Sequence, residues 1–356
     1  MQRWLRVCRG MVILELVLYG AFTNLFLAGT LIAPYHAPFI AMNQAAHWIT
    51  LLGLLAFAAG VFLNGSTRLR MWLAPGAIAF TIWFLPAWWP RHAPDVSGTT
   101  VTAATYNVNM WGAADPAGIV PVIAAMNADV VGLQELHPAL QARLDATLHD
   151  QYLYQVMEAV EGYEGFGLLS RFPVVESSVV MDVDWYPAGR RVPGYLRAVL
   201  DVDGQRMAVY VIHTPLPIHY IDSYSLAGYL QGLRYALFEY DDGLQLAHMR
   251  HIADLVAAEA MPALVLCDCN STPHSRQYDV LDGVLDDAFG AQGWGLGLSH
   301  PVRPFPMLRL DYVWYTSGFT ALDADVWPDA GTSDHHPVRA RLALAVPAAF
   351  SAPAGG

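Results

Sequence analysis

The sequence contains no lysine, so all 19 of its basic residues are arginine, which we attribute to codon bias rather than to function. Charged residues of both signs make up only 14% of the 356 residues, against about 25% in typical soluble domains. Cysteine occurs three times, too rarely for a small disulfide-stabilised scaffold. Because 55% of the residues are hydrophobic, the composition also disfavours a disordered chain, a coiled coil and a wholly soluble protein.

The few charges are unevenly distributed along the chain. Residues 1–90 contain one acidic residue, Glu15. The rest of the chain carries 14 of the 19 arginines and 30 of the 31 acidic residues, a formal charge of −16. The sequence therefore has an apolar, sparsely cationic first part and an acidic, water-compatible second part. The arginines of the first part are Arg3, Arg6, Arg9, Arg68 and Arg70.

Three apolar stretches in the first part, residues 11–33, 47–64 and 71–89, predict three transmembrane helices. A bilayer core of about 30 Å needs roughly 20 apolar residues in a helix. The alternatives are buried helices of a soluble protein or a cleaved signal peptide, but no small-residue cleavage site follows the first stretch. Arginines precede the first stretch and lie between the second and third. The positive-inside rule therefore predicts a multi-pass protein of the cell (inner) membrane with a cytoplasmic N-terminus and an extracytoplasmic second part.

The second part reads as a linker (residues 91–98), one domain (99–345) and a tail rich in Ala, Pro and Gly (346–356) that we expect to be disordered. Strand-like runs with helical patterns between some of them predict an α/β fold with sheets at the centre. The strand-like runs are Thr100–Tyr106, Asp129–Leu133, Phe166–Leu169, Arg197–Val202, Met207–Ile212, Ala263–Leu266, Leu310–Trp314 and Val338–Leu342. The helical patterns are Ile119–Met126, Pro138–Leu148 and Leu244–Ala258.

Polar residues repeatedly follow an apolar strand, where side chains emerge at the edge of a sheet. In Ala-Leu-Val-Leu-Cys-Asp268-Cys-Asn270, strand alternation places Asp268 and Asn270 on one face and Cys267 and Cys269 on the other. We expect the polar pair to face a cleft and the thiols to face the core. The two cysteines are too close in sequence along a strand to favour a disulfide, so no disulfide is predicted.

The same pattern recurs at the ends of other strand-like runs. Each position alone has an ordinary explanation, such as a turn-forming Asn, a solvated Glu or a half-buried His. Together they supply carboxylate, amide and imidazole groups and no thiolate, a set that favours Mg²⁺ or Mn²⁺ over Zn²⁺. These positions are Asn107, Glu135, His213, Asp311, Asp334 and His335.

The ordered motifs resemble those of the endonuclease/exonuclease/phosphatase superfamily, over roughly residues 100–343. One departure is that Cys267 and Cys269 stand where the family usually has Gly and Phe, which we interpret as a packing variant. The apolar first part looks like that of the membrane-anchored bacterial members. The motifs are Thr-Tyr-Asn107-Val-Asn, Leu-Gln-Glu135-Leu, Gly-Leu-Leu-Ser-Arg-Phe-Pro173, Ile-His213-Thr-Pro, Cys-Asp268-Cys-Asn270-Ser-Thr-Pro, Arg-Leu-Asp311-Tyr-Val and Ser-Asp334-His335-His-Pro-Val.

The resemblance implies a four-layered α/β sandwich, with two packed mixed sheets flanked by helices and the site at one end of the sheets. It implies that Glu135 is the main ligand of Mg²⁺ or Mn²⁺, with Asn107 and Asp334 near the metal. Whether Asp268 or His335 accepts the proton of the attacking water, and whether one or two metals act, stays open. The remaining implied roles belong to Asp311, which orients the ring of His335, to Asp268 and Asn270, which position the nucleophile and the phosphoryl group, and to His213, which donates to a phosphate oxygen.

The leading hypothesis is a membrane-anchored, metal-dependent phosphoester hydrolase acting on a phospholipid headgroup or a small phosphate ester. The runner-up is an extracytoplasmic nuclease acting on DNA or RNA, which the charge of −16 disfavours because no basic stripe is present. A catalytically silent scaffold is the third and least favoured hypothesis. A protein that has lost its activity normally loses at least one motif residue, and all of them are present here. Protein partners and oligomeric state stay open.

Weaker sites also have ordinary explanations. His248 and His251 are three apart on a predicted helix, a spacing that suits a metal pair but also a solvated helix face. Arg171 suits either a phosphate or a surface ion pair. The Tyr-rich stretch Ile218–Tyr240 follows His213 and suits a lid, a membrane contact or a packed helical insertion.

Overall fold

The computed structural model describes residues 2–63, 65–96, 98–109, 115–181, 194–217 and 226–345, so the predicted tail at 346–356 lies outside the described residues. The chain forms two compact units. The first, the helical unit, contains Met1–Pro90 together with Leu216–Gly243 and Ser271–Asp279. The second, the two-sheet unit, contains Arg91–Pro215, Leu244–Asn270 and Val280–Gly356.

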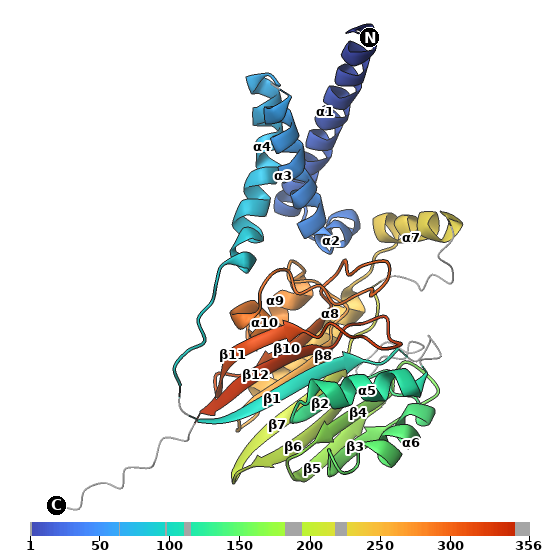
Figure 1. Ribbon diagram of the computed structural model, residues 1–356, viewed down its shortest axis with the longest axis vertical. Coiled ribbons are helices and arrows are strands. Elements are labelled where there is room, and N and C mark those ends of the chain that lie inside the picture. Colours follow the sequence, from blue (N-terminus) through green and yellow to red (C-terminus); the bar gives the residue numbers. More distant parts are fainter. Residues whose placement is uncertain are drawn as a thin grey trace, which may run out of the picture. The chain divides into compact units, whose positions relative to one another are not determined.

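The helical unit is built on three helices that pack closely. Gly53 of α3 and Gly76 of α4 meet where a side chain on either would not fit, since a Cβ on Gly53 would lie 2.9 Å from the Cα of Gly76. The Tyr19 hydroxyl of α1 donates to the carbonyl of Ile49 in α3 at 2.7 Å. The elements of this unit are α1 (Gln2–Ile32), α2 (Ala37–Asn43), α3 (Ala46–Phe62), α4 (Thr67–Trp83), the 3₁₀ helix η1 (Leu85–Trp88) and α7 (Leu226–Phe238) (Figure 1).

One helix of the described residues is long and apolar enough to cross a bilayer, over Val7–Ile32 of α1. The prediction of three spans was therefore wrong. Both α3 and α4 have 17 residues, about 26 Å at 1.5 Å per residue, which is shorter than a bilayer core of about 30 Å. In addition, α4 carries Arg68 and Arg70 in its first turn. Helices α2 and α3 meet at a 76° bend, and they are long and apolar enough to cross a bilayer only when the two are counted as one span.

The two-sheet unit contains two six-stranded mixed sheets, which confirms the predicted α/β fold. The first sheet has the order β11-β12-β1-β2-β4-β3, and the second β5-β6-β7-β8-β10-β9. Among the described strands, only β1 and β2 in the first sheet, and β7 and β8 in the second, run parallel to a neighbour. The strands are β1 (Gly98–Asn107), β2 (Val130–Gln134), β3 (Tyr154–Glu158), β4 (Phe166–Ser170), β5 (Val174–Val180), β6 (Tyr195–Val202), β7 (Gln205–His213), β8 (Ala263–Asp268), β9 (Asp286–Asp287), β10 (Asp311–Tyr315), β11 (Phe319–Val326) and β12 (Val338–Ala345).

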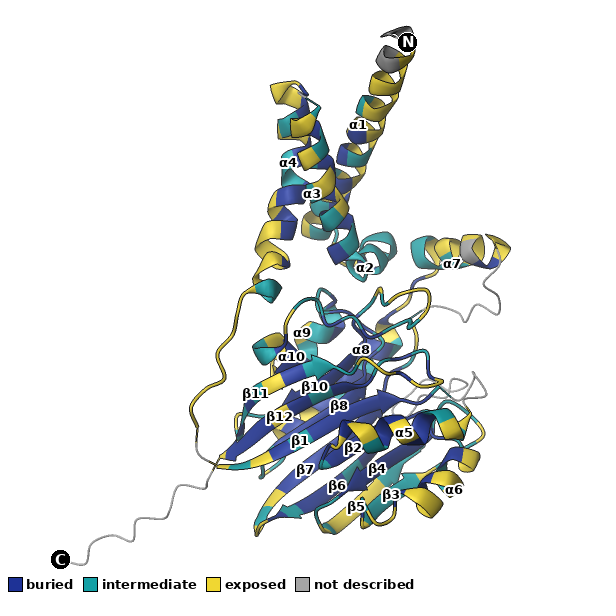
Figure 2. Cartoon of the chain, in the orientation of Figure 1, coloured by how far each residue is buried: buried dark blue, intermediate teal, exposed yellow. Residues whose placement is uncertain are grey.

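The core lies between the two sheets, where alternate strand residues from both sheets are buried together (Figure 2). The sheets approach closely at Gly132 of β2, where a Cβ would lie 2.8 Å from the Cβ of Leu266 in β8. Two residues further along β2, the buried Gln134 donates from Nε2 to the carbonyl of Leu266 (3.2 Å) and to the hydroxyl of Thr105 (3.0 Å). This amide joins the two sheets directly beneath the strand ends that carry the predicted site.

Helices cover the outer faces of the sheets, as the pattern of strands and helices predicts. Helices α5 and α6 bury Ile119, Ile123 and Leu144 against the first sheet. Helix α8 lies on the second sheet, where the ring of His251 lies beside that of Tyr195 in β6. The covering and connecting helices are α5 (Pro116–Met126), α6 (Pro138–Thr147), α8 (Gly243–Ala257), α9 (Arg276–Asp282) and α10 (Ala288–Gln292).

Candidate active site

Strand ends from both sheets place the predicted polar residues in one part of the two-sheet unit. In the second sheet, Asp268 at the end of β8 pairs in register with His213 at the end of β7 and with Asp311 at the start of β10. The three side chains therefore stem from one row across that sheet. In the first sheet, Asn107 ends β1 and Glu135 follows β2 directly. Parallel pairing brings Asn107 beside Glu135 and His213 beside Asp268, since parallel neighbours end at the same edge, and the antiparallel β10 begins at that edge with Asp311.

The buried amide of Asn107 joins the two sheets across the site. Its Nδ2 donates to Glu135 Oε1 (3.1 Å) and to Asp268 Oδ2 (2.8 Å). Glu135 has a positive φ of 59°, a conformation that is uncommon for a residue other than glycine. This backbone conformation occurs directly after the strand, where the chain must turn with the carboxylate at the site. Two carboxylates are therefore held together by one amide, an arrangement suited to a bound cation.

The segment after β8 departs from the predicted strand alternation. The strand ends at Asp268, and Asn270 has a φ of 43°, so Asn270 reaches the site through a turn in which its backbone N–H donates to Asp268 Oδ1 (3.1 Å). The prediction of no disulfide was wrong, because Cys267 and Cys269 form one. The turn shortens their Cα–Cα distance to 5.2 Å, within the range that a disulfide requires and below the ~6.6 Å of two residues along a strand.

His213 is oriented from both sides. Its Nδ1 lies 3.1 Å from the carbonyl oxygen of Tyr163, which can only accept, so Nδ1 carries a proton. Its Nε2 faces the site and lies 3.2 Å from Asn270 Nδ2 and 3.5 Å from Asp268 Oδ2. The Asn270 amide is itself fixed by donating to the carbonyl of Thr214 (2.8 Å). The imidazole and the amide thus present neighbouring polar groups beside the two carboxylates.

Asp311 and His335 form a buried pair. Asp311 Oδ2 lies 2.9 Å from His335 Nδ1 and also accepts the hydroxyl of Ser299 at 2.6 Å. The opposite ring nitrogen, His335 Nε2, points to Asp268 Oδ2 at 3.8 Å. The hydroxyl of Ser333 supports the loop by accepting the backbone N–H of His335 (3.0 Å) and donating to the carbonyl of Asn107 (2.7 Å).

The charges around His335 set its protonation. Burial by itself would lower the pKa of His335, but the carboxylates of Asp311 and Asp268 outweigh burial and raise its pKa well above the ordinary value. Burial raises the pKa of the Asp311 carboxyl, against the opposing effect of the His335 charge. The two carboxylates therefore favour the protonated form of the ring.

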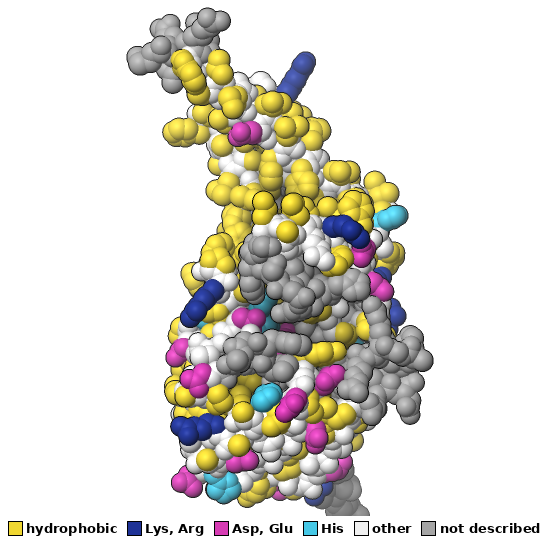
Figure 3. All heavy atoms as spheres, turned by 90° about the vertical axis from the view of Figure 1, so that its right-hand side faces the viewer, with side chains coloured by type: hydrophobic (Ala, Val, Ile, Leu, Met, Phe, Trp, Pro, Cys, Tyr) yellow, Lys and Arg dark blue, Asp and Glu magenta, His cyan; other side chains and the backbone are white. Residues whose placement is uncertain are grey.

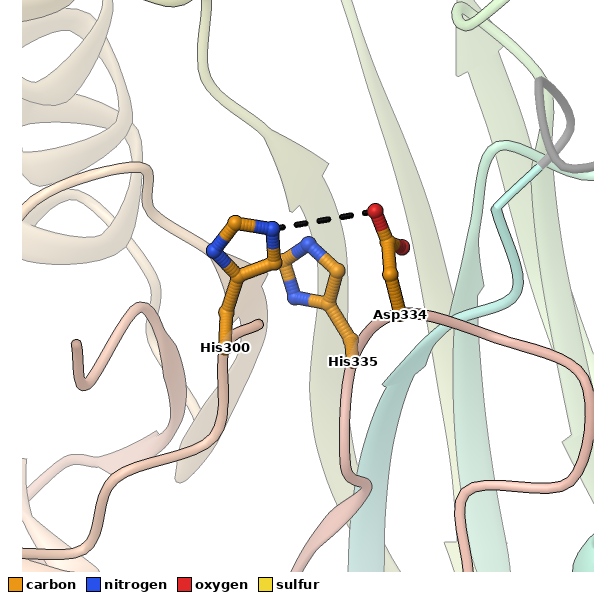
Figure 4. A group of neighbouring side chains, drawn as sticks. All are labelled: His300, Asp334 and His335. Atoms are coloured by element: carbon orange, nitrogen blue, oxygen red, sulfur yellow. Dashed lines mark ion pairs between the residues drawn. The ribbon is translucent and has the colours of Figure 1, made fainter. Parts of the chain in front are cut away.

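His300, in the loop before β10, is a site residue that the sequence analysis missed. Its ring lies over that of His335, with centroids 4.4 Å apart, and its Nε2 is 3.7 Å from Asp334 Oδ2 (Figure 4). Burial by itself would raise the pKa of Asp334, but His300 and His335 lower it to about 2. The sequence Leu-Ser-His300-Pro has no strand before it and no metal-ligand spacing, so nothing in the pattern marks this residue.

The residues present suit a divalent cation. Two groups among the described residues bring three potential ligand atoms within 4.8 Å of one another: Asp268 with Asp311 and His335, and His300 with Asp334 and His335. Asp311 Oδ1 is buried and has no hydrogen-bond partner among the described residues. The first group offers two carboxylates and one imidazole, a set that suits a hard cation such as Mg²⁺ or Mn²⁺, whereas the second offers two imidazoles and one carboxylate. The nearby cysteines are joined in a disulfide and supply no thiolate.

The predicted metal residues lie in two places. Asn107 and Glu135 lie together beside Asp268, whereas Asp334 pairs with His300. The weaker candidates lie elsewhere: His248 is fully buried on α8, and neither it nor His251 belongs to a metal-competent group of described residues. Arg171 pairs with Asp129 at 3.1 Å, which favours the surface ion pair.

Gln245 is a second residue that the sequence analysis missed. From α8 its Nε2 donates to the carbonyls of Asn270 (2.7 Å) and Cys269 (3.1 Å), so it supports the turn that carries Asn270. It lies within a correctly predicted helix, but the sequence does not show which residue of a helix reaches a distant turn.

Comparison with known proteins agrees with this geometry. Residues 104–335 match the model of the endonuclease/exonuclease/phosphatase family. None of the curated proteins matches the chain. A solved endonuclease/exonuclease/phosphatase from Beutenbergia cavernae DSM 12333 is similar, with a TM-score of 0.50, 23% identity and coverage of 69% of this chain and 72% of that chain.

Two further solved structures share the fold. A family protein from Bacteroides thetaiotaomicron has a TM-score of 0.51 and 16% identity, covering 70% of this chain and 100% of its own. D. rerio TDP2 in complex with a single-strand DNA product has a TM-score of 0.51 and 15% identity, covering 68% and 99%. The structures establish the fold, and the family match spans all the predicted site residues from Asn107 to His335. The chain belongs to the endonuclease/exonuclease/phosphatase family.

Proposed function

We propose that the protein is a metal-dependent phosphoester hydrolase that is anchored in a membrane through α1. The observation that carries the proposal is the buried Asp311–His335 pair, whose free ring nitrogen faces Asp268 beside the Asn107–Glu135 pair. Family membership supports hydrolysis of a phosphoester bond.

In this proposal the attacking water lies between His335 and Asp268. The 3.8 Å separation between His335 Nε2 and Asp268 Oδ2 is too long for a direct hydrogen bond and suits a bridging water. Asp311 on Nδ1 holds the ring in the tautomer and orientation that general-base catalysis needs. A bound divalent cation would supply Lewis-acid stabilisation and offset the carboxylate charge around His335. Both Asp268 and His335 remain candidates for the proton acceptor.

His213 and Asn270 bind the phosphoryl group in this scheme. Nδ1 of His213 is occupied by the Tyr163 carbonyl, so Nε2 is the ring nitrogen that would face a phosphate oxygen. The Asn270 amide lies beside that nitrogen and stabilises the charge that develops in the transition state. The predicted ligands Glu135, Asn107 and Asp334 would hold the cation.

For the substrate we favour a phospholipid headgroup or a small phosphate ester. A membrane anchor brings the enzyme to lipid, and the acidic second part of the chain lacks the basic stripe of a nucleic-acid-binding protein. A nuclease is the second candidate, because the similar TDP2 structure contains a single-strand DNA product.

The test uses the full-length protein in detergent with Mg²⁺ or Mn²⁺, and with EDTA as control. Phospholipids, sugar phosphates, nucleotides and plasmid DNA are offered together and followed by mass spectrometry and gel electrophoresis. We expect metal-dependent loss of a lipid or small ester. Loss of DNA alone would establish the nuclease, and no loss of any class would contradict the proposed hydrolase.

We also propose that the N-terminus is cytoplasmic and the two-sheet unit extracytoplasmic, because Arg3, Arg6 and Arg9 lie at the N-terminal end of α1. Asp95→Cys in a Cys8→Ser background places one reactive thiol in the linker, since the other two cysteines form a buried disulfide. A membrane-impermeant thiol reagent should label this variant in intact cells. Labelling only after lysis would reverse the orientation.

A further inference from the structure

Helix α7 exposes a stripe of leucines. Leu226, Leu230 and Leu233 are 77%, 59% and 56% exposed, and their spacing of four and three residues places them on one helix face. Phe238, at the end of the helix, is 76% exposed. Soluble surfaces seldom present such a continuous apolar face, and one that is exposed marks an interaction site.

The opposite face of α7 is the one that packs. Gly228 is buried and Gly232 and Ala236 are half-buried, and helical geometry places these small residues away from the leucines. Helix α7 packs against α2 within the helical unit (Figure 1). Just beyond α7, the hydroxyl of Tyr240 accepts a hydrogen bond from Gln44 Nε2 at 3.0 Å. The helix is therefore held by its small-residue face, and its apolar face is left outward.

The position of α2 relates this face to the membrane-spanning helix. Helix α2 begins at Ala37, five residues after the end of α1 at Ile32. Helix α3 packs against α1, and α2 is bent by 76° from α3. The axis of α2 therefore runs across that of the candidate spanning helix. Leu31 and Ile32, at this end of α1, are each 83% exposed. Helix α2 packs against both α1 and α7, so the leucines of α7 belong to the same helical unit as this exposed end of the candidate span.

We infer that the leucine face of α7 inserts into the surface of the lipid bilayer. A helix with leucines on one side, no acidic residue within Leu226–Phe238 and an arginine, Arg234, beside the apolar stripe has the composition of an interfacial helix. On the face shown in Figure 3, hydrophobic side chains cover the helical unit, whereas acidic side chains gather on the two-sheet unit. Helices α7 and α1, both of the helical unit, thereby contact lipid together.

The chain connects this surface directly to the catalytic residues. Leu216, where the segment bearing α7 begins, comes three residues after His213. Ser271 follows Asn270 directly and begins the other inserted segment, whose Thr272 donates its backbone N–H to Gln44 Oε1 at 2.8 Å. If the proposed hydrolase function holds, on which this step rests, the substrate is a phosphoester presented at a bilayer surface rather than one dissolved in water.

The experiment measures the depth of α7 in lipid, independently of activity. Full-length protein with Cys8→Ser is reconstituted into vesicles of phosphatidylethanolamine and phosphatidylglycerol, with Leu230→Cys carrying an NBD fluorophore. The matched control is Gln231→Cys, one residue along but on the side of the helix away from the stripe. We expect blue-shifted emission and quenching by nitroxide-labelled lipid at position 230, and quenching by an aqueous quencher at position 231.

Two results would overturn the inference. Equal access of both labels to the aqueous quencher would place the leucines in water. Shielding of the label at position 230 from both quenchers would show that protein, such as a second copy of the chain, covers the face.

An activity measurement then tests the link to substrate. Leu230→Ser with Leu233→Ser should lower hydrolysis of a vesicle-borne phospholipid by about tenfold or more. Each leucine removed from the lipid should weaken the binding of the protein to the vesicle by about tenfold. Hydrolysis of a water-soluble phosphate ester should be unchanged. Equal loss on both substrates would contradict a lipid-docking role, whereas wild-type protein that is inactive on both would refute the proposed function and leave the quenching result standing.

Discussion

The hydrogen bond between Asp311 and His335 is the contact between single residues on which the proposed chemistry most depends. Removing the ring in His335→Ala, or the charge in Asp311→Asn, should reduce kcat by about 10²–10⁴, the contribution of a general acid–base group. Both variants should remain folded by circular dichroism, because the core between the sheets is untouched. Wild-type turnover in either variant would show that this pair does not act in the reaction.

Glu259, which is not one of the candidate site residues, allows a prediction of how the free energy of unfolding changes with pH. Hydrogen bonding from Arg197 (2.6 Å), and a further one from Tyr210, lower the pKa of Glu259 below its ordinary 4.5, although burial opposes the shift. A carboxyl with a lowered folded-state pKa stabilises the fold above the unfolded pKa and loses that contribution as pH falls through the folded pKa.

Acidification below pH 4.5 should therefore lower the free energy of unfolding more in the wild type than in Glu259→Gln. Chemical denaturation of both proteins at neutral and acidic pH measures this difference. A parallel decline in the two proteins would contradict the assignment.

The residues that sequence could and could not identify differ in how they reach the site. Asn107, Glu135, His213 and Asp268 end or follow strands, so the apolar run before each one marks it. His300 comes from a loop with no such signal, and its contact with His335 depends on tertiary structure.

The cysteine pair was missed for a related reason. Strand geometry was applied to Cys267 and Cys269, whereas the strand ends between them at Asp268. Boundaries of elements depend on the turn that follows, and the turn here includes the left-handed Asn270.

At the scale of elements, the eight predicted strands are the interior strands of the two sheets. The four that the sequence analysis missed, β3, β5, β9 and β11, are the edge strands. Interior strands are covered on both faces and read as apolar runs, but β5, with its exposed Glu176 and Ser177, is open on one side. Hydrophobic patterning therefore predicts the interior strands of each sheet but not the edge strands.

The amide of Gln134 gives a prediction at this scale, because it ties one sheet to the other beneath the site. Gln134→Ala should destabilise the fold by about 1–3 kcal/mol, since it leaves the buried Leu266 carbonyl without this donor. Gln205→Ala, which removes an exposed hydrogen bond to the carbonyl of Ala345, should cost less than about 0.5 kcal/mol. Urea unfolding compares the two variants, and equal losses would mean that Gln134 does not join the sheets energetically.

For the whole molecule, the sequence separates an apolar part from an acidic one, and the structure adds that this separation does not follow chain order. Leu216–Gly243 and Ser271–Asp279 belong to the helical unit although they lie within the acidic second part of the sequence. Hydropathy alone could not assign them, because membership of a unit depends on packing such as that of α7 on α2. The same limit explains the overcount of spans, since apolar character does not report where a helix ends.

Metal-dependent hydrolysis is the central claim, and the most direct measurement is turnover of a phosphate diester against Mn²⁺ or Mg²⁺ concentration, for the wild type and Glu135→Gln. We predict that wild-type turnover saturates with metal and is abolished by EDTA. Neutralising one of the two carboxylates held by Asn107 should shift the Glu135→Gln curve to higher metal concentration. Turnover that persists in EDTA, or identical metal curves for the two proteins, would contradict the account.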